Sequence, residues 1–159
     1  MGLAPISEDK YTEFAIRLFE KGGKRLEGTT VHEVYSRFSG VTSCLQRVMN
    51  VLYFRTSRGD NCTPEMVGDA INYLLDLYSE NYETQLSQMS EKQWIVFRSI
   101  VAEGKAKNVT GGAFIKKYHL WSASSVMSAL KALLDKDFIT QEDGVYMAYD
   151  QFFAMWILR

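Results

Sequence analysis

The stretch after Lys136 most constrains the fold, because the spacing of apolar side chains changes there from helical to alternating. Two β-prone runs, 138–140 and 145–148, flank the tetrapeptide Gln141-Glu142-Asp143-Gly144. An Asp-Gly pair between two such runs is a strong signal for a β-hairpin. The sequence therefore predicts a short hairpin close to the end of a chain whose other segments have helical spacing.

Three helical segments precede this hairpin and one follows it. Ser90 and Gln93 have the spacing of a capping box at the start of the first. Apolar periodicity predicts helices over 91–102, 113–118, from Ser122 or Ser124 to 135, and over 151–158 after a capping Asp150. Helix, short helix, turn, helix and hairpin make the winged variant of the helix-turn-helix. We therefore predict a winged-helix domain over residues 87–159.

The first half of the chain predicts a small helical bundle over residues 1–86. Ser7 is placed to cap a helix over 8–21, which Gly22-Gly23 ends, and Thr30 to cap a second over 31–38. A third helix is expected over 42–55. Thr63-Pro64-Glu65 predicts the start of a fourth, which runs to about residue 85. The segments 24–29 and 56–62 are expected to be polar loops. The predicted fold class is mainly α: a small helical bundle followed by a winged helix-turn-helix with one short hairpin.

Composition and charge narrow the possible environments and ligands. The chain has 159 residues, 47% of them apolar, and a formal net charge of −1. Residues 1–89 hold 9 basic and 12 acidic residues, whereas residues 90–159 hold 9 basic and 7 acidic residues. The basic excess of the second half is small for a nucleic-acid-binding domain.

Cys44 and Cys62 are isolated, which predicts free thiols in a reducing, cytoplasmic environment. The apolar run 152–158 is too short to span a membrane, so no membrane association is expected.

No arrangement of residues in the sequence predicts catalysis. A phosphate-binding loop requires G-x-x-x-x-G-K-[ST], but Gly23-Lys24 has Leu18 at the first glycine position and Gly104-Lys105 has Ser99. His32 and His119 lie in different predicted domains, and neither has a catalytic partner nearby in the sequence. We therefore expect a non-enzymatic chain with no catalytic residues, no metal ligands and no cofactor of its own.

The predicted helix 123–135 is the candidate nucleic-acid surface. With Val126, Leu130 and Leu133 turned inward, an outward polar face remains, and serine and lysine side chains contact phosphates and base edges. The candidate DNA-binding residues are Ser124, Ser125, Ser128 and Lys131, with Lys116 and Lys117 on the preceding helix. The hairpin turn contains the acidic residues Glu142 and Asp143, which argues against DNA binding because phosphate groups repel acidic side chains. A protein-binding role of the winged helix is the alternative.

Many short segments, in order along the chain, resemble the corresponding segments of one protein family. They include Pro5-Ile6 with Tyr11, Phe14 and Phe19; Phe38-Ser39-Gly40-Val41-Thr42 with Leu45-Gln46; Leu86-Ser87 to Gln93; Ser122-Ala123-Ser124-Ser125-Val126 with Ala129-Leu130, Leu133-Leu134 and Phe138-Ile139; and Tyr146, Asp150, Phe153 and Trp156. The pattern resembles the C-terminal region of the archaeal-type P-loop ATPases, an AAA+/STAND-related family. The chain departs from it at Thr42 and Gln151, where many relatives have proline.

This resemblance implies that the bundle is a lid-like domain and that the chain couples or regulates an ATPase. The nucleotide-binding core, an expected partner, would then lie outside this sequence, and ATP with magnesium would be the cofactor of the parent protein. Arg47 and Arg37 become the candidates for sensing nucleotide from the lid side. DNA or a protein is the expected further partner. The alternatives are a stand-alone winged-helix transcription regulator, with recognition helices about 34 Å apart in a dimer, and a protein-interaction module.

Overall fold

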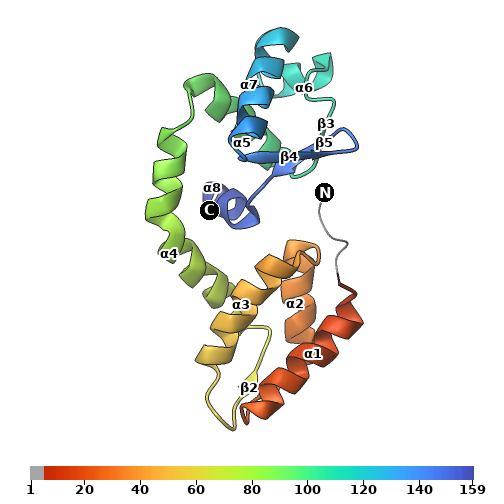
Figure 1. Cartoon of the computed structure of the whole chain (residues 1–159), viewed down its shortest axis with the longest axis vertical. Coiled ribbons are helices and arrows are strands. Elements are labelled where there is room, and N and C mark those ends of the chain that lie inside the picture. Colours follow the sequence, from red (N-terminus) through yellow and green to blue (C-terminus); the bar gives the residue numbers. More distant parts are fainter. Residues whose placement is uncertain (1–5) are drawn as a thin grey trace. The chain divides into compact units, whose positions relative to one another are not determined.

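The computed structural model describes residues 6–159, so Pro5 of the family resemblance lies outside the described residues. The chain divides into two compact units, one ending at Leu77 and the other spanning Tyr78–Arg159 (Figure 1). The division falls inside α4 (Met66–Ser87), whereas the sequence places the boundary at residue 86, the end of this helix. The reason is that the second half of α4 contributes Tyr78 and Tyr82 to the core of the second unit.

The first unit is built from three helices and the beginning of α4. These helices are α1 (Glu8–Lys21), α2 (Gly28–Phe38) and α3 (Thr42–Arg55). Ser7 caps α1 by accepting a hydrogen bond from the Lys10 N–H, as expected. The buried core comprises Tyr11, Ala15, Phe19, Val31, Val34, Phe38, Leu45, Val48, Leu52, Val67, Ala70 and Leu74, among others. The predicted amphipathic stripes of these helices supply most of this core.

Two segments of this unit that were expected to be polar loops each contain a short strand. Strand β1 (Arg25–Leu26) pairs in parallel with β2 (Asn61–Cys62). Thr30 is not a helix cap, because α2 already begins at Gly28 and Thr30 is buried. Its hydroxyl instead donates to the Cys62 carbonyl at 2.8 Å. The Thr30 hydroxyl, which the sequence predicts to cap a helix, therefore bonds to a backbone carbonyl of β2.

The second unit has the element order of a winged helix. Helices α5 (Glu91–Glu103), α6 (Gly112–Lys117) and α7 (Ala123–Asp135) precede the hairpin, and α8 (Gln151–Leu158) follows it. The hairpin strands are β4 (Ile139–Glu142) and β5 (Val145–Ala148). The sequence did not predict β3 (Ala106–Lys107), which pairs with β5 and gives an antiparallel sheet in the order β3-β5-β4. The predicted mainly helical fold with a winged helix is confirmed.

Local signals in the sequence explain the boundaries of this unit. Both halves of the Ser90–Gln93 capping box are present. Asp143 and Gly144 have positive φ values of 51° and 76°, as a type I′ hairpin turn requires at its two central positions. Asp150 caps α8 by accepting from the Phe152 N–H at 2.9 Å. The tight turn and the caps therefore form where the sequence predicts them.

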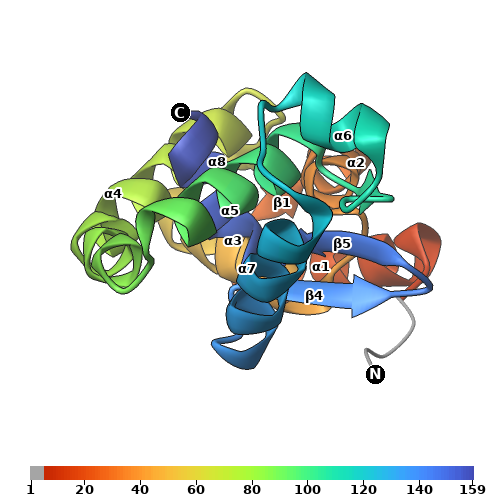
Figure 2. The ribbon, with the colours of Figure 1, turned by 90° about the horizontal axis from the view of Figure 1, so that it is seen from above.

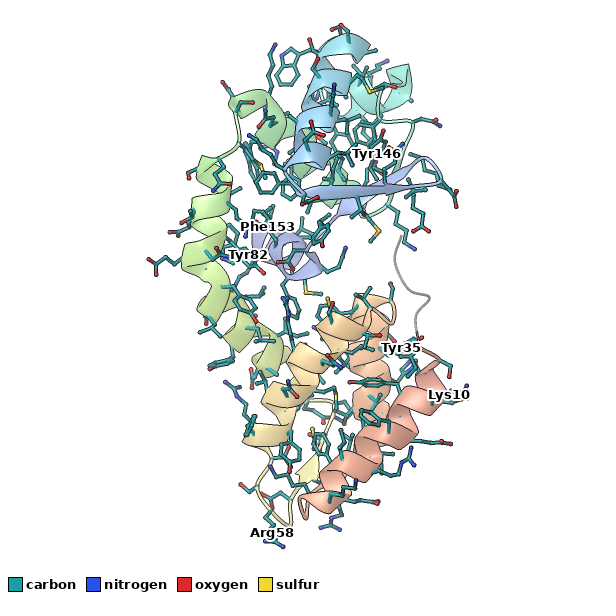
Figure 3. The ribbon with its side chains drawn as sticks, in the orientation of Figure 1. Lys10, Tyr35, Arg58, Tyr82, Tyr146 and Phe153 are labelled. Atoms are coloured by element: carbon teal, nitrogen blue, oxygen red, sulfur yellow. The ribbon has the colours of Figure 1, made fainter. Side chains whose placement is uncertain are left out.

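Aromatic side chains fill the core between α4, α5 and α8. The Tyr82 ring stacks on Phe153, with 4.8 Å between the ring centroids (Figure 3). The Tyr82 hydroxyl donates to Asp150 at 3.0 Å, and the Trp156 indole N–H donates to Ser79 at 3.1 Å. Phe97 of α5 lies 5.4 Å from Phe153. The end of α4 is therefore an integral part of the winged-helix core.

Candidate binding surface of the winged helix

Helix α7 is held in the second unit by a buried apolar stripe and presents a polar face to solvent. It packs against α5 and β4 (Figure 2). Its buried side chains are Val126, Ala129, Leu130 and Leu133. The exposed residues Ser124, Met127, Ser128 and Lys131 follow helical spacing and form what we call the α7 face. Ser125 is half-buried at the edge of this face. The candidate residues of α7 therefore lie close together on or beside one surface.

The serines at the start of α7 are hydrogen-bonded to one another. Ser122 caps the helix by accepting from the Ser125 N–H at 3.2 Å. Its hydroxyl also lies 3.1 Å from the Ser124 hydroxyl and 3.1 Å from that of Ser125. These bonds order the side chains at the N-terminus of the helix, where the helix dipole favours an anion.

The two lysines of α6 differ in their surroundings. Lys116 and Lys117 are both exposed, and Lys117 forms an ion pair with Glu103 at 2.5 Å. The Tyr118 hydroxyl also donates to Glu103, at 2.6 Å. Hydrogen bonds from Lys117 and then Tyr118 lower the pKa of Glu103, and the bond to Glu103 raises the pKa of Lys117. Glu103 thus offsets the charge of Lys117, a contact that the sequence did not predict.

A shallow hollow of about 300 Å³ lies between the start of α5 and α7. It is lined by Ser90, Lys92, Gln93, Ser125, Ser128 and Ala129. The Lys92 ammonium lies 5.4 Å from the centre of the exposed Trp121 ring. The sequence alone does not assign Lys92, Gln93 or Trp121 to the candidate site. The packing of α5 on α7 brings Lys92 and Gln93 beside Ser125 and Ser128, and no local motif in the sequence carries that information. Trp121 directly precedes Ser122 in the sequence.

The charges of this unit are balanced overall. Between Tyr78 and Arg159 there are nine basic and nine acidic residues, a net charge of zero. Glu142 and Asp143 are exposed at the tip of the hairpin. The exposed lysines of these helices are Lys92 on α5, Lys116 and Lys117 on α6, and Lys131 on α7, with Lys136 directly after α7. This surface is therefore polar and modestly basic at the helices but acidic at the wing.

The two arginines predicted to sense nucleotide lie on different helices of the first unit. Arg37, near the end of α2, is ion-paired with Glu33 at 2.8 Å. Arg47 is exposed in the second turn of α3. Their role in nucleotide sensing stays a prediction.

Among residues 6–159, no group of three or more His, Cys, Asp and Glu side chains is placed to hold a metal ion. Within the same residues, no helix combines the length and apolarity needed to cross a bilayer.

The helix order, the three-stranded sheet and the exposed face of α7 together define a winged-helix protein. The sequence over residues 80–159 matches the family described as "Probable winged helix domain". This match covers just over half of the 159 residues. The chain therefore belongs to this winged-helix family.

A solved structure is similar to both units. The chain superposes on the Walker-type ATPase PABY2304 of Pyrococcus abyssi with a TM-score of 0.70 and 15% sequence identity. The similarity covers 98% of this chain but only 43% of that ATPase chain, so the chain spans less than half of its structural relative. At this identity the likeness defines the fold alone. No curated protein matches the sequence.

Proposed function

We propose that this chain is a non-catalytic regulatory region of a Walker-type ATPase. The observation that carries the proposal is that 98% of the chain, both units included, follows 43% of the chain of one such ATPase. In this proposal the first unit has the role of a lid-like domain. The winged helix is the module that binds another molecule, and its binding would depend on the nucleotide that the ATPase holds.

The nucleotide core belongs to a part of the ATPase that this sequence does not contain. The two Gly-Lys pairs of the chain lack the remaining residues of a phosphate-binding loop. ATP and magnesium would bind that core, and Arg37 or Arg47 would approach the nucleotide from the lid side. Titration of Mg-ATP into the purified chain, followed by calorimetry, should give no binding in the micromolar range. Micromolar binding by the chain itself would contradict this division of roles.

Duplex DNA is the first candidate ligand of the winged helix. The α7 face combines Ser124, Ser128 and Lys131, and Lys116 lies on the preceding helix. These groups suit contacts with phosphates and base edges. Binding to a random-sequence duplex, measured by fluorescence anisotropy, should weaken between about 50 and 200 mM salt because counterions are released. Lys131→Glu should abolish binding, whereas Arg58→Glu in the first unit changes the net charge equally and should leave binding intact.

A protein ligand is the second candidate, favoured by two specific features. The acidic tip at Glu142 and Asp143 repels phosphate, and Met127 is 51% exposed at the centre of the α7 face. If the chain does not bind the duplex at about 50 mM salt, direct DNA binding is wrong and the α7 face is assigned to a protein partner. Equal loss of binding in Lys131→Glu and Arg58→Glu would also reject α7 as the DNA reader.

A further inference from the structure

An apolar groove between α1 and α3 is not used by the proposed function. It has a volume of about 680 Å³, and its walls include Phe14, Leu18, Met49, Tyr53 and Phe54. Phe14 is 48% exposed and Phe54 is 82% exposed. Aromatic side chains gathered in one exposed groove are unfavourable in water, and such patches mark binding surfaces. Two helices with a groove between them are suited to a third, amphipathic helix.

The charges beside this groove are predominantly basic. On α1, Lys10, Arg17 and Lys21 recur at helical spacing with Phe14 and Leu18, so these five residues share one face. Among the residues that line the groove, Lys21 is charged and none is acidic. Glu13 lies beside Arg17, outside the groove. Helix α3 contains Arg47 and Arg55 and no acidic residue. A helix that enters the groove should therefore be acidic at its flanks.

The outer face of α4 has the complementary chemistry. Helix α4 contains four acidic residues, Asp69, Asp76, Glu80 and Glu83, and no basic residue. Tyr73 is 45% exposed and Leu77 is 60% exposed. Asp69, Tyr73, Leu77 and Glu80 are separated by three or four residues and so share one face. This face, which we call the α4 face, has two apolar anchors with acidic residues on either side.

We propose that the α4 face of a second copy of this chain binds in the groove between α1 and α3. Tyr73 and Leu77 of one copy would contact Phe14 and Phe54 of the other, and Asp69 and Glu80 would approach Arg17 and Lys21. Within one chain the Arg55 guanidinium lies 4.8 Å from the centre of the Tyr73 ring. Arg55 is not among the residues that line the groove, so this contact of Tyr73 within its own chain is made outside the groove. In the two-fold dimer that we infer, each copy offers both surfaces to the other.

Sedimentation equilibrium of the whole chain between about 1 and 200 µM tests the dimer. The wild-type chain should dimerise within this range, and more weakly at higher salt because the flanking charges are screened. Phe54→Ser and Leu77→Ser should each raise the dissociation constant at least tenfold, as expected for central apolar anchors. Leu158→Ser removes an equally exposed side chain outside both surfaces and should change nothing. A monomeric wild-type chain at 200 µM, or a dimer that tolerates both substitutions, overturns the proposal.

A charge-reversal mixture separates this contact from other modes of dimerisation. Arg17→Glu with Lys21→Glu makes the groove acidic, and Asp69→Lys with Glu80→Lys makes the α4 face basic. Each double variant should be monomeric alone, because its groove and its α4 face then carry the same charge. An equal mixture should form a heterodimer, since both contacts again join opposite charges. Circular dichroism of each variant confirms that it is folded. Failure of the mixture to associate, when the wild type dimerises, would show that these surfaces do not meet.

Discussion

At the scale of single residues, Gly22 is a glycine whose position leaves no room for a side chain. A Cβ atom built at Gly22 would lie 2.1 Å from the Tyr53 hydroxyl oxygen. The Tyr53 ring cannot move away freely, because it packs edge-on against Phe19 at 5.2 Å and beneath the Lys24 ammonium at 3.7 Å. The close approach of α3 to the end of α1 therefore requires glycine at this position.

Gly22→Ala should lower the free energy of unfolding by about 1–3 kcal/mol, the usual cost of overpacking. Urea denaturation followed by circular dichroism measures it. Gly68→Ala is the matched control, because a Cβ there meets no atom within 4 Å and the residue lies inside α4. That substitution should stabilise the chain by about 0.5–1 kcal/mol through helix propensity. Equal effects of the two substitutions would contradict the steric explanation.

The buried Tyr11 side chain makes the stability of the first unit depend on pH in the alkaline range. Burial raises the pKa of Tyr11 from 10.0 to about 12. The folded chain therefore keeps a proton that the unfolded chain releases above pH 10. This contribution to stability is complete below pH 10 and is lost as the pH rises from 10 to 12. Tyr11→Phe cannot ionise, so between about pH 9 and pH 11.5 it should lose less stability than the wild type. Urea midpoints of both proteins at each pH provide the measurement, and parallel losses would refute the assignment.

At the scale of secondary-structure elements, the sequence identifies most segments whose stability is local. Helix α5 follows its N-cap Ser90, α8 follows its N-cap Asp150, and the hairpin turns at Asp143-Gly144. Caps and tight turns depend on neighbouring residues, so local sequence reports them. The apolar stripe of α7 likewise predicts which residues form the α7 face. This much of the candidate site could be derived before the structure.

The elements that the sequence did not predict depend on distant partners. Strands β1, β2 and β3 have two residues each and no alternating pattern of their own. Strand β1 exists because the Arg25 N–H donates to the Asp60 carbonyl at 2.9 Å, far along the chain. The Lys117–Glu103 ion pair and the hollow beside Ser125 also depend on residues that are far apart in the sequence, so the sequence did not predict them. Local patterns cannot report a contact that only tertiary packing creates.

Tyr82 connects the end of α4 to α8, and two substitutions separate its polar and apolar contributions. Tyr82→Phe removes only the hydroxyl that donates to Asp150 and should cost about 1–2 kcal/mol of unfolding free energy. Tyr82→Ala also removes the stacked ring and should cost about 3–5 kcal/mol. Tyr149→Phe, at a largely exposed tyrosine, is the control and should have little effect. Chemical denaturation measures all three, and equal costs for Phe and Ala would show that the ring contributes no packing energy.

At the scale of the whole molecule, the chain has two buried cores. Leu45 and Leu52 are fully buried in the unit that ends at Leu77, whereas Leu130 and Leu133 are buried in the unit that begins at Tyr78. Cooperative unfolding follows such cores, because opening one unit exposes the apolar surface of that unit first. The uninterrupted helix α4 is the covalent link between them. Stability should therefore be partitioned along the chain.

Leu45→Ala and Leu130→Ala test this partition by placing a cavity in one core at a time. Each should cost about 2–5 kcal/mol in its own unit. Hydrogen exchange followed by mass spectrometry should show that Leu45→Ala reduces protection up to about residue 77 and leaves α5 and α7 protected. Leu130→Ala should do the reverse. If either substitution lowers protection equally throughout the chain, α4 couples the two cores into one cooperative unit. In the proposed regulatory role, any influence of the first unit on the winged helix passes through coupling of this kind, so the same experiment measures its strength.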